Sequence, residues 1–377
     1  MTPLNQLETP ALLLDKARME RNIERMRRQV QRLGVAFRPH VKTNKCIDVA
    51  RRLTSRPDGP ITVSTLLEAD HFAGHGFKDI LYAVCIAPNK IDHVLALQAR
   101  GAGMSIILDS VEAAHMVAGR LPKGSDGVAV LIEIDTDGHR SGVPPDSPQL
   151  LEIARALAGG GIEVRGVMTH AGSSYDCRSP DALRAMAQQE RAGAVHAAQR
   201  LREAGFACPV VSVGSTPTAL FAEQLDGVTE LRAGVFVFFD LAMAGIGVCE
   251  IDDIALSVLA TVIGHQREKG WTLLDAGWMA MSRDRATAGQ PLDQGYGLVC
   301  DLQGRPLDDY ILVGANQEHG IMARRPGAGA DTLELAIGQQ VRILPNHACS
   351  TAAQYPAYQV VGTDNAVTDR WSRFSGW

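Results

Sequence analysis

The chain has 377 residues, of which 46% are hydrophobic and 21% charged, and its formal net charge is −5 at pH 7. It is too long for one ordinary domain, and its negative charge argues against nucleic acid or an anionic membrane surface as a partner. No long apolar run predicts a membrane span, residues 1–9 do not resemble a signal peptide, and the seven scattered cysteines are typical of reduced thiols in a cytoplasmic protein.

Helical and strand-like patterns alternate over the first 245 residues. The helix predicted over 15–33 places Met19, Ile23 and Met26 at steps of three and four, on one apolar face. Apolar strand-like runs follow at 36–42, 61–65, 79–84, 104–109, 128–135, 163–170, 209–214 and 231–240. Residues that commonly cap helices open several of the intervening segments: Asn89, Ser110, Ser147 and Ser179.

Apolar strands separated by helices predict a parallel sheet that is covered on both faces, and eight of them predict a (β/α)8 barrel of the TIM type. The alternative is an open doubly wound sheet, but no Gly-rich dinucleotide motif follows the first strand. We therefore predict a barrel domain over 10–245.

The pattern changes after residue 245. Strand-like runs are joined by turn residues with little helix between them: 255–265, 271–276, 297–302, 310–314, 340–345 and 357–362. This pattern predicts a mainly β domain over 246–377, and we expect residues 1–9 to pack on it.

Polar residues follow the predicted barrel strands at their C-terminal ends, where barrel enzymes carry their active sites. The first strand ends in Lys42, and burial there would favour the neutral amine that forms a Schiff base with a carbonyl compound. Ser215 and Thr216 open a helix-like segment after the seventh strand, which makes a workable phosphate site together with Gly234. The alternatives are that Lys42 is an ordinary surface lysine and that Ser215 or Thr216 only caps a turn.

Three more side chains of this rim are candidates for ligand contacts. Arg140 lies in a loop flanked by glycines, where it either contacts a cofactor or forms a surface ion pair. His170 and Tyr175 follow the sixth strand, and each either stacks on or hydrogen-bonds a planar ring, or has local polar partners.

The β domain contains the sequence His347-Ala348-Cys349. On a strand, residues i and i+2 point to the same face, so the imidazole and the thiol can share a divalent metal such as zinc. Two neighbouring ligands favour an open site that faces a substrate, while a buried cysteine beside a hydrogen-bonded histidine is the alternative. A second polar cluster at a strand end either orients metal-bound water or forms a turn: Gln317, Glu318 and His319.

As a set, these motifs resemble the D-serine dehydratase and D-threo-3-hydroxyaspartate dehydratase family. These are fold-type III enzymes that use pyridoxal 5′-phosphate (PLP) and have an alanine-racemase-like barrel with a β domain. The similar segments occur in the same order along nearly the whole chain: 38–43, 135–142, 170–175, 214–217, 277–284, 317–320 and 347–349.

The resemblance implies a role for each site residue. Lys42 would carry PLP, and the PLP phosphate would lie near Ser215, Thr216, Gly234 and Val235. His170 and Tyr175 would lie near the cofactor, Arg140 would face its pyridine nitrogen, and His347 with Cys349 would bind a divalent metal (Zn, Mn, Mg or Co).

The function implied is that of a dehydratase, which converts a β-hydroxy D-amino acid to a 2-oxo acid and ammonia and forms a homodimer. Lys42 would remove the Cα proton, and the metal would make the β-hydroxyl a better leaving group. A 3-carboxylate on the substrate would need a cation, for which Arg283, Arg285 and His319 are candidates.

Four alternatives remain open. The nearest is a D-threonine-type aldolase, which yields glycine and an aldehyde. Such aldolases carry His-x-Asp at the metal position, so the His-x-Cys of this chain favours dehydration. A racemase needs a second base that cannot be assigned, and a non-catalytic PLP carrier resembles a lone barrel. An enzyme of sugars or nucleotides on a plain barrel would use Lys42 only in an ion pair.

Overall fold

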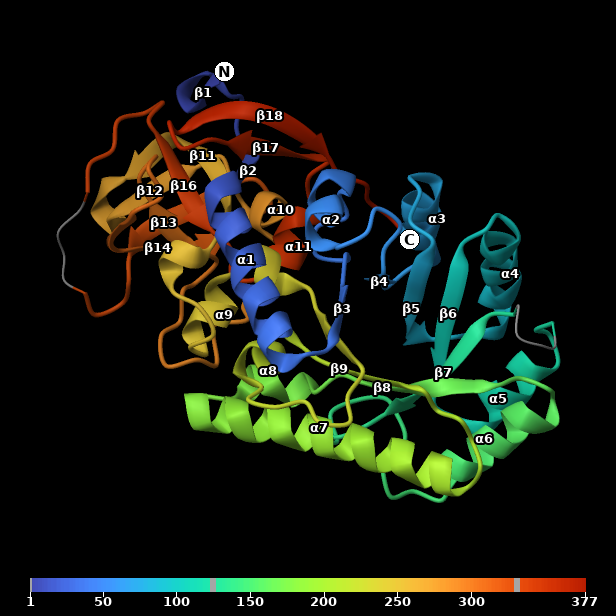
Figure 1. Cartoon of the computed structure of the whole chain (residues 1–377). Helices are drawn as coiled ribbons and strands as arrows, with labels where there is room; N and C mark the ends of the chain where they lie inside the picture. The colour runs from blue at the N-terminus through green and yellow to red at the C-terminus, as the bar shows by residue number, and fades with distance from the viewer. Residues whose placement is uncertain (1, 123–126, 329–332) are drawn as a thin grey trace. The chain divides into compact units, whose positions relative to one another are not determined.

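The computed structural model describes residues 2–122, 127–328 and 333–377. The chain forms two compact units, shown in Figure 1. One contains Met1–Arg25 and Val235–Ser375, and the other contains Met26–Gly234 and Gly376–Trp377. Helix α1 (Lys16–Leu33) passes from the first unit into the second, and its residues Met19, Ile23 and Met26 are buried, as the periodicity predicts.

The second unit is built on an eight-stranded parallel sheet in the order β3-β10-β9-β8-β7-β6-β5-β4. All eight predicted strands are present: β3 (Ala36–Pro39), β4 (Ile61–Val63), β5 (Asp79–Cys85), β6 (Gly103–Leu108), β7 (Ala129–Ile134), β8 (Val164–Thr169), β9 (Val210–Val213) and β10 (Glu230–Ala233). The two end strands meet through a bridge between His40 and Thr62, which nearly closes the barrel. The predicted (β/α)8 barrel is therefore confirmed.

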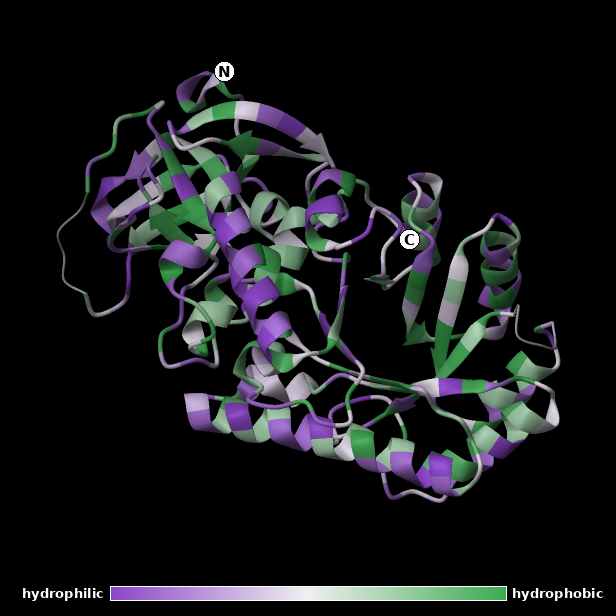
Figure 2. Cartoon of the chain, in the orientation of Figure 1, coloured by the Kyte–Doolittle hydropathy of each residue, from purple (hydrophilic) through white to green (hydrophobic). Residues whose placement is uncertain are grey.

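Helices follow most of these strands: α2 (Ile47–Leu53), α3 (Leu66–Gly74), α4 (Ile91–Ala99), α5 (Val111–Ala118), α6 (Gln149–Gly159), α7 (Pro180–Glu203) and α8 (Thr216–Phe221). Hydrophilic and hydrophobic residues alternate along α7, as expected of a helix with one buried side (Figure 2). The predicted caps Ser110 and Ser179 accept backbone N–H groups of α5 and α7. The Ser147 hydroxyl accepts the Gln149 N–H at the start of α6 at 3.2 Å, although Pro148 holds the N-cap position. Asn89 does not cap α4, because that helix begins after Lys90.

The other unit contains a ten-stranded sheet. Six of its strands close into an antiparallel barrel: β11 (Leu256–Gln266), β12 (Trp271–Leu274), β15 (Gly320–Arg324), β14 (Pro306–Ala315), β13 (Leu298–Cys300) and β16 (Gln340–Leu344). Four more extend the sheet beyond β11: β2 (Ala11–Asp15), β17 (Ala357–Val361), β18 (Ala366–Ser372) and β1 (Thr2–Pro3). The short helices of this unit include α9 (Leu241–Gly245), α10 (Trp278–Met281) and α11 (Ala348–Ala352).

Three local predictions were wrong. Strand β3 ends at Pro39, so Lys42 lies in a turn and its side chain is exposed. The predicted strand 231–240 breaks after Ala233, because the next residues turn into a 3-10 helix over Val235–Val237. Cys349 lies not on a strand but in α11, where the chain has left the sheet and Ala residues favour a helix.

No helix in the described part of the chain is both long enough and apolar enough to span a membrane.

Candidate active site

Two imidazoles lie near Lys42 at the rim of the parallel barrel, and the first of them is His40. The Lys42 backbone N–H donates to His40 Nδ1 at 3.4 Å, and His40 Nε2 lies 3.5 Å from the Ser64 hydroxyl. Because His40 Nδ1 accepts a hydrogen bond, its proton is on Nε2. Burial, and then the positive charge of Lys42, lower the pKa of His40 well below its ordinary value. His40 is therefore neutral at physiological pH.

His170 follows β8 and shares these surroundings. Its Nδ1 lies 3.1 Å from the carbonyl oxygen of Gly214, so Nδ1 carries the proton and Nε2 keeps a lone pair. Burial, followed by the charge of Lys42, lowers the pKa of His170 to about 3. The amine of Lys42 thus lies close enough to both imidazoles to act on their charge.

The turn after β9 packs closely against the backbone of β10. Gly214 has φ +130°, and a Cβ atom there would lie 2.1 Å from the Arg232 carbonyl oxygen, so only glycine fits. Ser215 caps α8 by accepting the Thr218 N–H, and its hydroxyl also meets that of Ser174 at 3.0 Å. The Ser215 hydroxyl therefore serves the turn itself.

One buried carboxylate joins the ends of two neighbouring strands. Glu190 of α7 is only 2% exposed, and its Oε1 accepts the Ala171 N–H at 2.8 Å and the Gly214 N–H at 3.2 Å. Burial raises the pKa of Glu190. The segments that begin with His170 and Gly214 are thereby fixed with respect to each other.

A buried guanidinium lies under the same rim. Arg232 of β10 donates to the Ser212 hydroxyl at 2.7 Å and to the Thr169 carbonyl at 2.5 Å. Burial lowers its pKa, while Glu230 and Glu190 act in the opposite direction. Arg232 contributes a fixed positive charge that also helps to keep His40 and His170 neutral.

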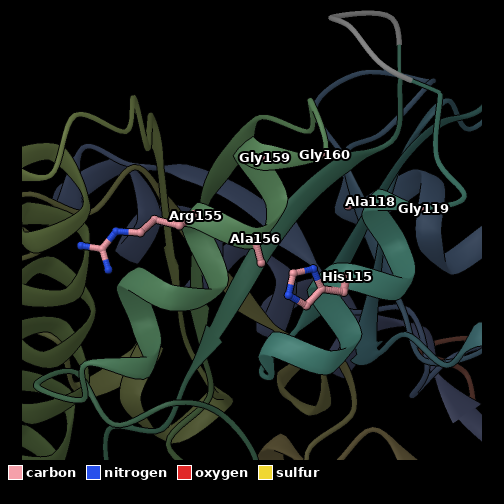
Figure 3. A pocket seen from close by; sticks show the side chains of 7 residues that line it. All are labelled: His115, Ala118, Gly119, Arg155, Ala156, Gly159 and Gly160. Carbon is pink, nitrogen blue, oxygen red and sulfur yellow. The ribbon is translucent and has the colours of Figure 1, made fainter.

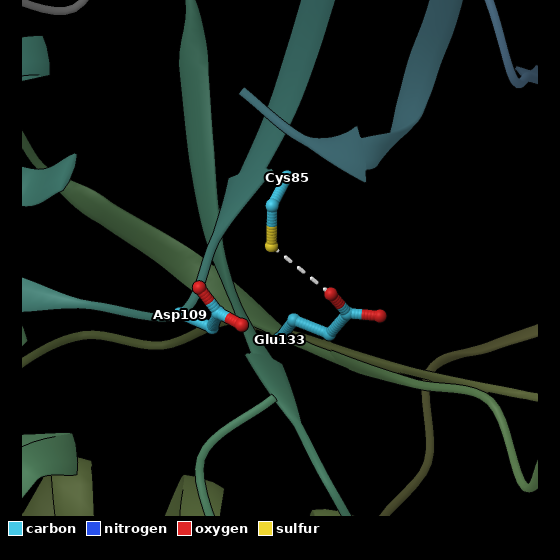
Figure 4. Close-up of side chains that lie close together, drawn as sticks. All are labelled: Cys85, Asp109 and Glu133. Atoms are coloured by element: carbon cyan, nitrogen blue, oxygen red, sulfur yellow. Dashed lines mark hydrogen bonds between the residues drawn. The ribbon is translucent and has the colours of Figure 1, made fainter. Parts of the chain in front are cut away.

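A third group lies at the ends of β5, β6 and β7, where donor atoms of Cys85, Asp109 and Glu133 are within 4.8 Å of one another (Figure 4). The Cys85 thiol donates to Glu133 at 3.1 Å, and the Asp109 carboxylate accepts the Gly142 N–H at 3.1 Å. Burial and the Glu133 carboxylate raise the pKa of Cys85, so it is a neutral thiol. The group is a hydrogen-bonded network that supports the loop of Arg140.

The other predicted cofactor residues have different degrees of exposure. The Arg140 side chain is exposed, and Tyr175 is 38% exposed with its ring centroid 6.5 Å from that of His170. Thr216 and Val235 are buried, and Gly234 contacts His40, whose carbonyl oxygen would lie 2.9 Å from an added Cβ. Gly234 ends one compact unit and Val235 begins the other.

His347 and Cys349 come together although they do not share a strand. His347 Nδ1 lies 2.6 Å from Asp284 Oδ2, and hydrogen bonds to Asp284 and Cys349 outweigh burial and raise the pKa of His347 to about 11. An imidazole and a thiol are ligands suited to zinc and similar metals. The second predicted polar cluster is about 30 positions earlier in the chain than His347. It consists of exposed residues in the turn between β14 and β15: Gln317, Glu318 and His319. In this turn the Asn316 N–H donates to the His319 carbonyl at 2.8 Å.

Four residues of these clusters had no role in the sequence prediction: His40, Glu190, Arg232 and Asp284. A charged residue inside an apolar strand, as at Arg232, is the one signal that could have identified a member of this set. Asp284 is 63 positions from His347 and gives no local signal.

A surface depression between α5 and α6 is unrelated to these clusters. Its wall includes Ala118 and Gly160, and a Cβ added at Gly160 would meet the Ala118 Cβ at 2.3 Å. Figure 3 shows the guanidinium of Arg155 pointing away from His115, so the charged groups do not converge there. The depression follows from close packing of small residues.

Comparison with known proteins finds a matching family model for each half of the chain. Residues 14–242 match the model of the alanine racemase N-terminal domain, and residues 255–361 match that of a putative serine dehydratase domain. The chain is 56% identical over 374 residues to the D-threo-3-hydroxyaspartate dehydratase of Delftia sp. (strain HT23), covering 98% of each. It is 29% identical to the D-serine dehydratase of Dictyostelium discoideum over 99% of this chain and 98% of that protein. Identity to the D-threonine aldolase of an Arthrobacter species is 30%, over 98% and 93% of the two chains.

Solved structures agree with this picture. The Delftia dehydratase superposes with a TM-score of 0.95 at 54% identity, covering all of both chains. Two variants of a D-threo-3-hydroxyaspartate dehydratase also superpose with a TM-score of 0.95, one with a histidine replaced by alanine and one with a cysteine replaced by alanine in the metal-free form. The alanine racemase of Clostridium difficile 630 shares the fold at 14% identity and a TM-score of 0.66, covering 98% of this chain and all of that one.

Proposed function

Because the chain belongs to the D-serine dehydratase and D-threo-3-hydroxyaspartate dehydratase family, we propose that it is a PLP- and metal-dependent dehydratase that acts on D-threo-3-hydroxyaspartate or a similar β-hydroxy D-amino acid. The observation that carries the proposal is the 56% identity to the Delftia dehydratase over 98% of both chains. The net reaction removes water and then adds it back, so that the substrate becomes a 2-oxo acid and ammonia.

The surroundings of Lys42 support PLP as the cofactor. An exposed primary amine lies near two neutral imidazoles, so an aldehyde can reach it. Bound through Lys42, PLP supplies the ring that accepts electron density from Cα. The glycine-containing turn at Gly214 and the backbone of Ser215 and Thr216 would hold its phosphate, with Gly234 and Val235 as further contacts. Arg140, His170 and Tyr175 would line its ring.

Lys42 is the proposed base. Its Nζ would accept the Cα proton, and the neutral state of His40 and His170 limits the repulsion that the resulting ammonium meets. A single base on one side of the reacting carbon would select one enantiomer.

The donor set of His347 and Cys349 supports a divalent metal. The two substituted positions in the solved variants of a D-threo-3-hydroxyaspartate dehydratase lie two residues apart, as do His347 and Cys349. A metal held there would act as a Lewis acid on the leaving β-hydroxyl. Zinc, manganese, magnesium and cobalt all remain candidates, and Gln317, Glu318 and His319 are the proposed polar residues on the substrate side.

The direct test compares products. Purified enzyme incubated with D-threo-3-hydroxyaspartate, D-serine and D-threonine should release 2-oxo acid and ammonia in equal amounts, and a chelator should stop this release until metal is returned. Lys42→Ala should remove both the visible absorbance of lysine-bound PLP and the activity. Glycine and an aldehyde as the main products would instead establish the aldolase function suggested by the Arthrobacter relative.

A homodimer in the cytoplasm is part of the same proposal. All seven cysteines lie in the described part of the chain as thiols outside any disulfide, which fits a reducing compartment. Light scattering of the purified protein would measure its oligomeric state.

A further inference from the structure

We propose that Asp284 is the positioning residue of the metal site: its carboxylate holds the His347 ring so that Nε2 is the nitrogen left for the metal. This inference rests on the metal site of the proposed function and adds a residue to it. Asp284 would not bind the metal itself but would decide how the imidazole is presented beside Cys349.

The contact itself has the required geometry. His347 Nδ1 and Asp284 Oδ2 are 2.6 Å apart, and because a carboxylate only accepts, the imidazole donates from Nδ1. A metal-binding histidine usually donates its second ring nitrogen in this manner, which fixes the tautomer and the ring orientation. With Nδ1 engaged, the metal has one ring nitrogen to bind.

The backbone on either side of His347 is already anchored by other residues. Asn346 is 3% exposed, and its Nδ2 donates to the Gly295 carbonyl at 2.6 Å. On the other side the Ala348 N–H donates to Asp240 Oδ2 at 2.9 Å, and Asp240 is 1% exposed. Only the rotation of the imidazole about its side-chain bonds remains for Asp284 to restrict.

The segment that carries Asp284 is held in place beside α11. Ser282 has φ +80°, a conformation that residues other than glycine rarely adopt, and its N–H donates to the Trp278 carbonyl at 2.7 Å. The Ser282 hydroxyl accepts the Asp284 N–H at 3.2 Å. One residue earlier, the Met281 carbonyl accepts the Thr351 hydroxyl at 2.6 Å. The turn is thus constrained at several points and directs Asp284 towards His347.

The experiment must separate positioning from a plain ion pair, which would produce the same contact and add only stability. Mn²⁺ affinity would be measured by calorimetric titration of the PLP-loaded enzyme. Co²⁺ would then replace Mn²⁺, and its visible spectrum at saturation would report the geometry of the ligands. The variants would be Asp284→Ala and Asp284→Asn. The control would be Asp301→Ala, because Asp301 is a half-buried carboxylate of the same unit that accepts the Arg305 and Gln303 N–H groups.

For Asp284→Ala we expect metal affinity to fall by roughly 10–100-fold, as is typical when such a partner is removed, with an altered Co²⁺ spectrum and unchanged PLP absorbance. Asp284→Asn retains an acceptor and should lose affinity several-fold, while Asp301→Ala should bind metal as the unchanged enzyme does. Unchanged affinity and spectrum in either Asp284 variant would overturn the proposal; Asp284→Asn decides if Asp284→Ala does not fold. A His347→Ala variant that binds metal normally would instead remove the metal site itself, and with it the basis of this inference.

Discussion

At the scale of single residues, the cations next to the metal motif differ in whether they are already neutralised. Arg285 pairs with Asp293 at 2.6 Å. Arg283 lies over the Trp278 ring, 5.1 Å from its centroid, and makes no ion pair with any of the described residues. His319 lies in the exposed turn between β14 and β15. Because no described carboxylate pairs with Arg283, we infer that it is the best candidate of the three to accept a second carboxylate of the substrate.

Replacing Arg283 should therefore change substrate preference. For Arg283→Gln we expect kcat/KM for D-threo-3-hydroxyaspartate to fall about 10–100-fold, because a hydrogen bond to a charged group contributes about 1.5–3 kcal/mol. D-serine has no 3-carboxylate, so its kcat/KM should change little. Arg305→Gln, at an exposed arginine of the same unit, is the control, and equal losses on both substrates would contradict this role for Arg283.

At the scale of elements, helix α7 does more than cover the parallel sheet. It brings Glu190 under the ends of β8 and β9, where one oxygen accepts two backbone N–H groups. Both donors lie in the turns that carry His170 and Ser215. A buried N–H group without a partner is costly, so this single side chain stabilises the geometry of two turns.

Removing that carboxylate should destabilise the protein. For Glu190→Ala we expect the free energy of unfolding to fall by about 2–4 kcal/mol, because two buried N–H groups lose their acceptor. Glu190→Gln keeps an acceptor oxygen and should cost less. Urea denaturation measures both, with Glu203→Ala, an exposed glutamate at the end of the same helix, expected within about 0.5 kcal/mol of the unchanged protein. A loss no larger than that of Glu203→Ala would show that the hydrogen bonds of Glu190 contribute little to the free energy of unfolding.

At the scale of the whole molecule, the two neutral imidazoles connect stability to pH. His40 and His170 have pKa values below their ordinary value in the folded state, that of His170 being about 3. The unfolded chain therefore takes up protons at higher pH than the folded chain does. The stability that these groups contribute is fully present above about pH 6.5 and is lost as the pH falls towards 3.

The expected outcome is a free energy of unfolding that decreases between pH 6.5 and 5, by about 1.6 kcal/mol for His170 and by a further amount for His40. Urea titrations without added PLP or metal would measure it. His170→Gln can still donate to the Gly214 carbonyl and should reduce the slope, while the exposed His115→Gln should not. A His170→Gln variant with the full slope would assign the pH dependence to other groups.

The sequence alone determined the eight barrel strands, the long helix α1 and the strand-rich second half, because their apolar periodicity is a local property of neighbouring residues. It also supplied the motif around Lys42 and the spacing of His347 and Cys349. Tertiary structure alone decided that Lys42 lies in an exposed turn, and that Glu190 bridges two strand ends. It also decided that Asp284 meets His347 across 63 positions. Such contacts depend on strand order and on where the chain leaves the sheet, and neither is set by the residues nearby.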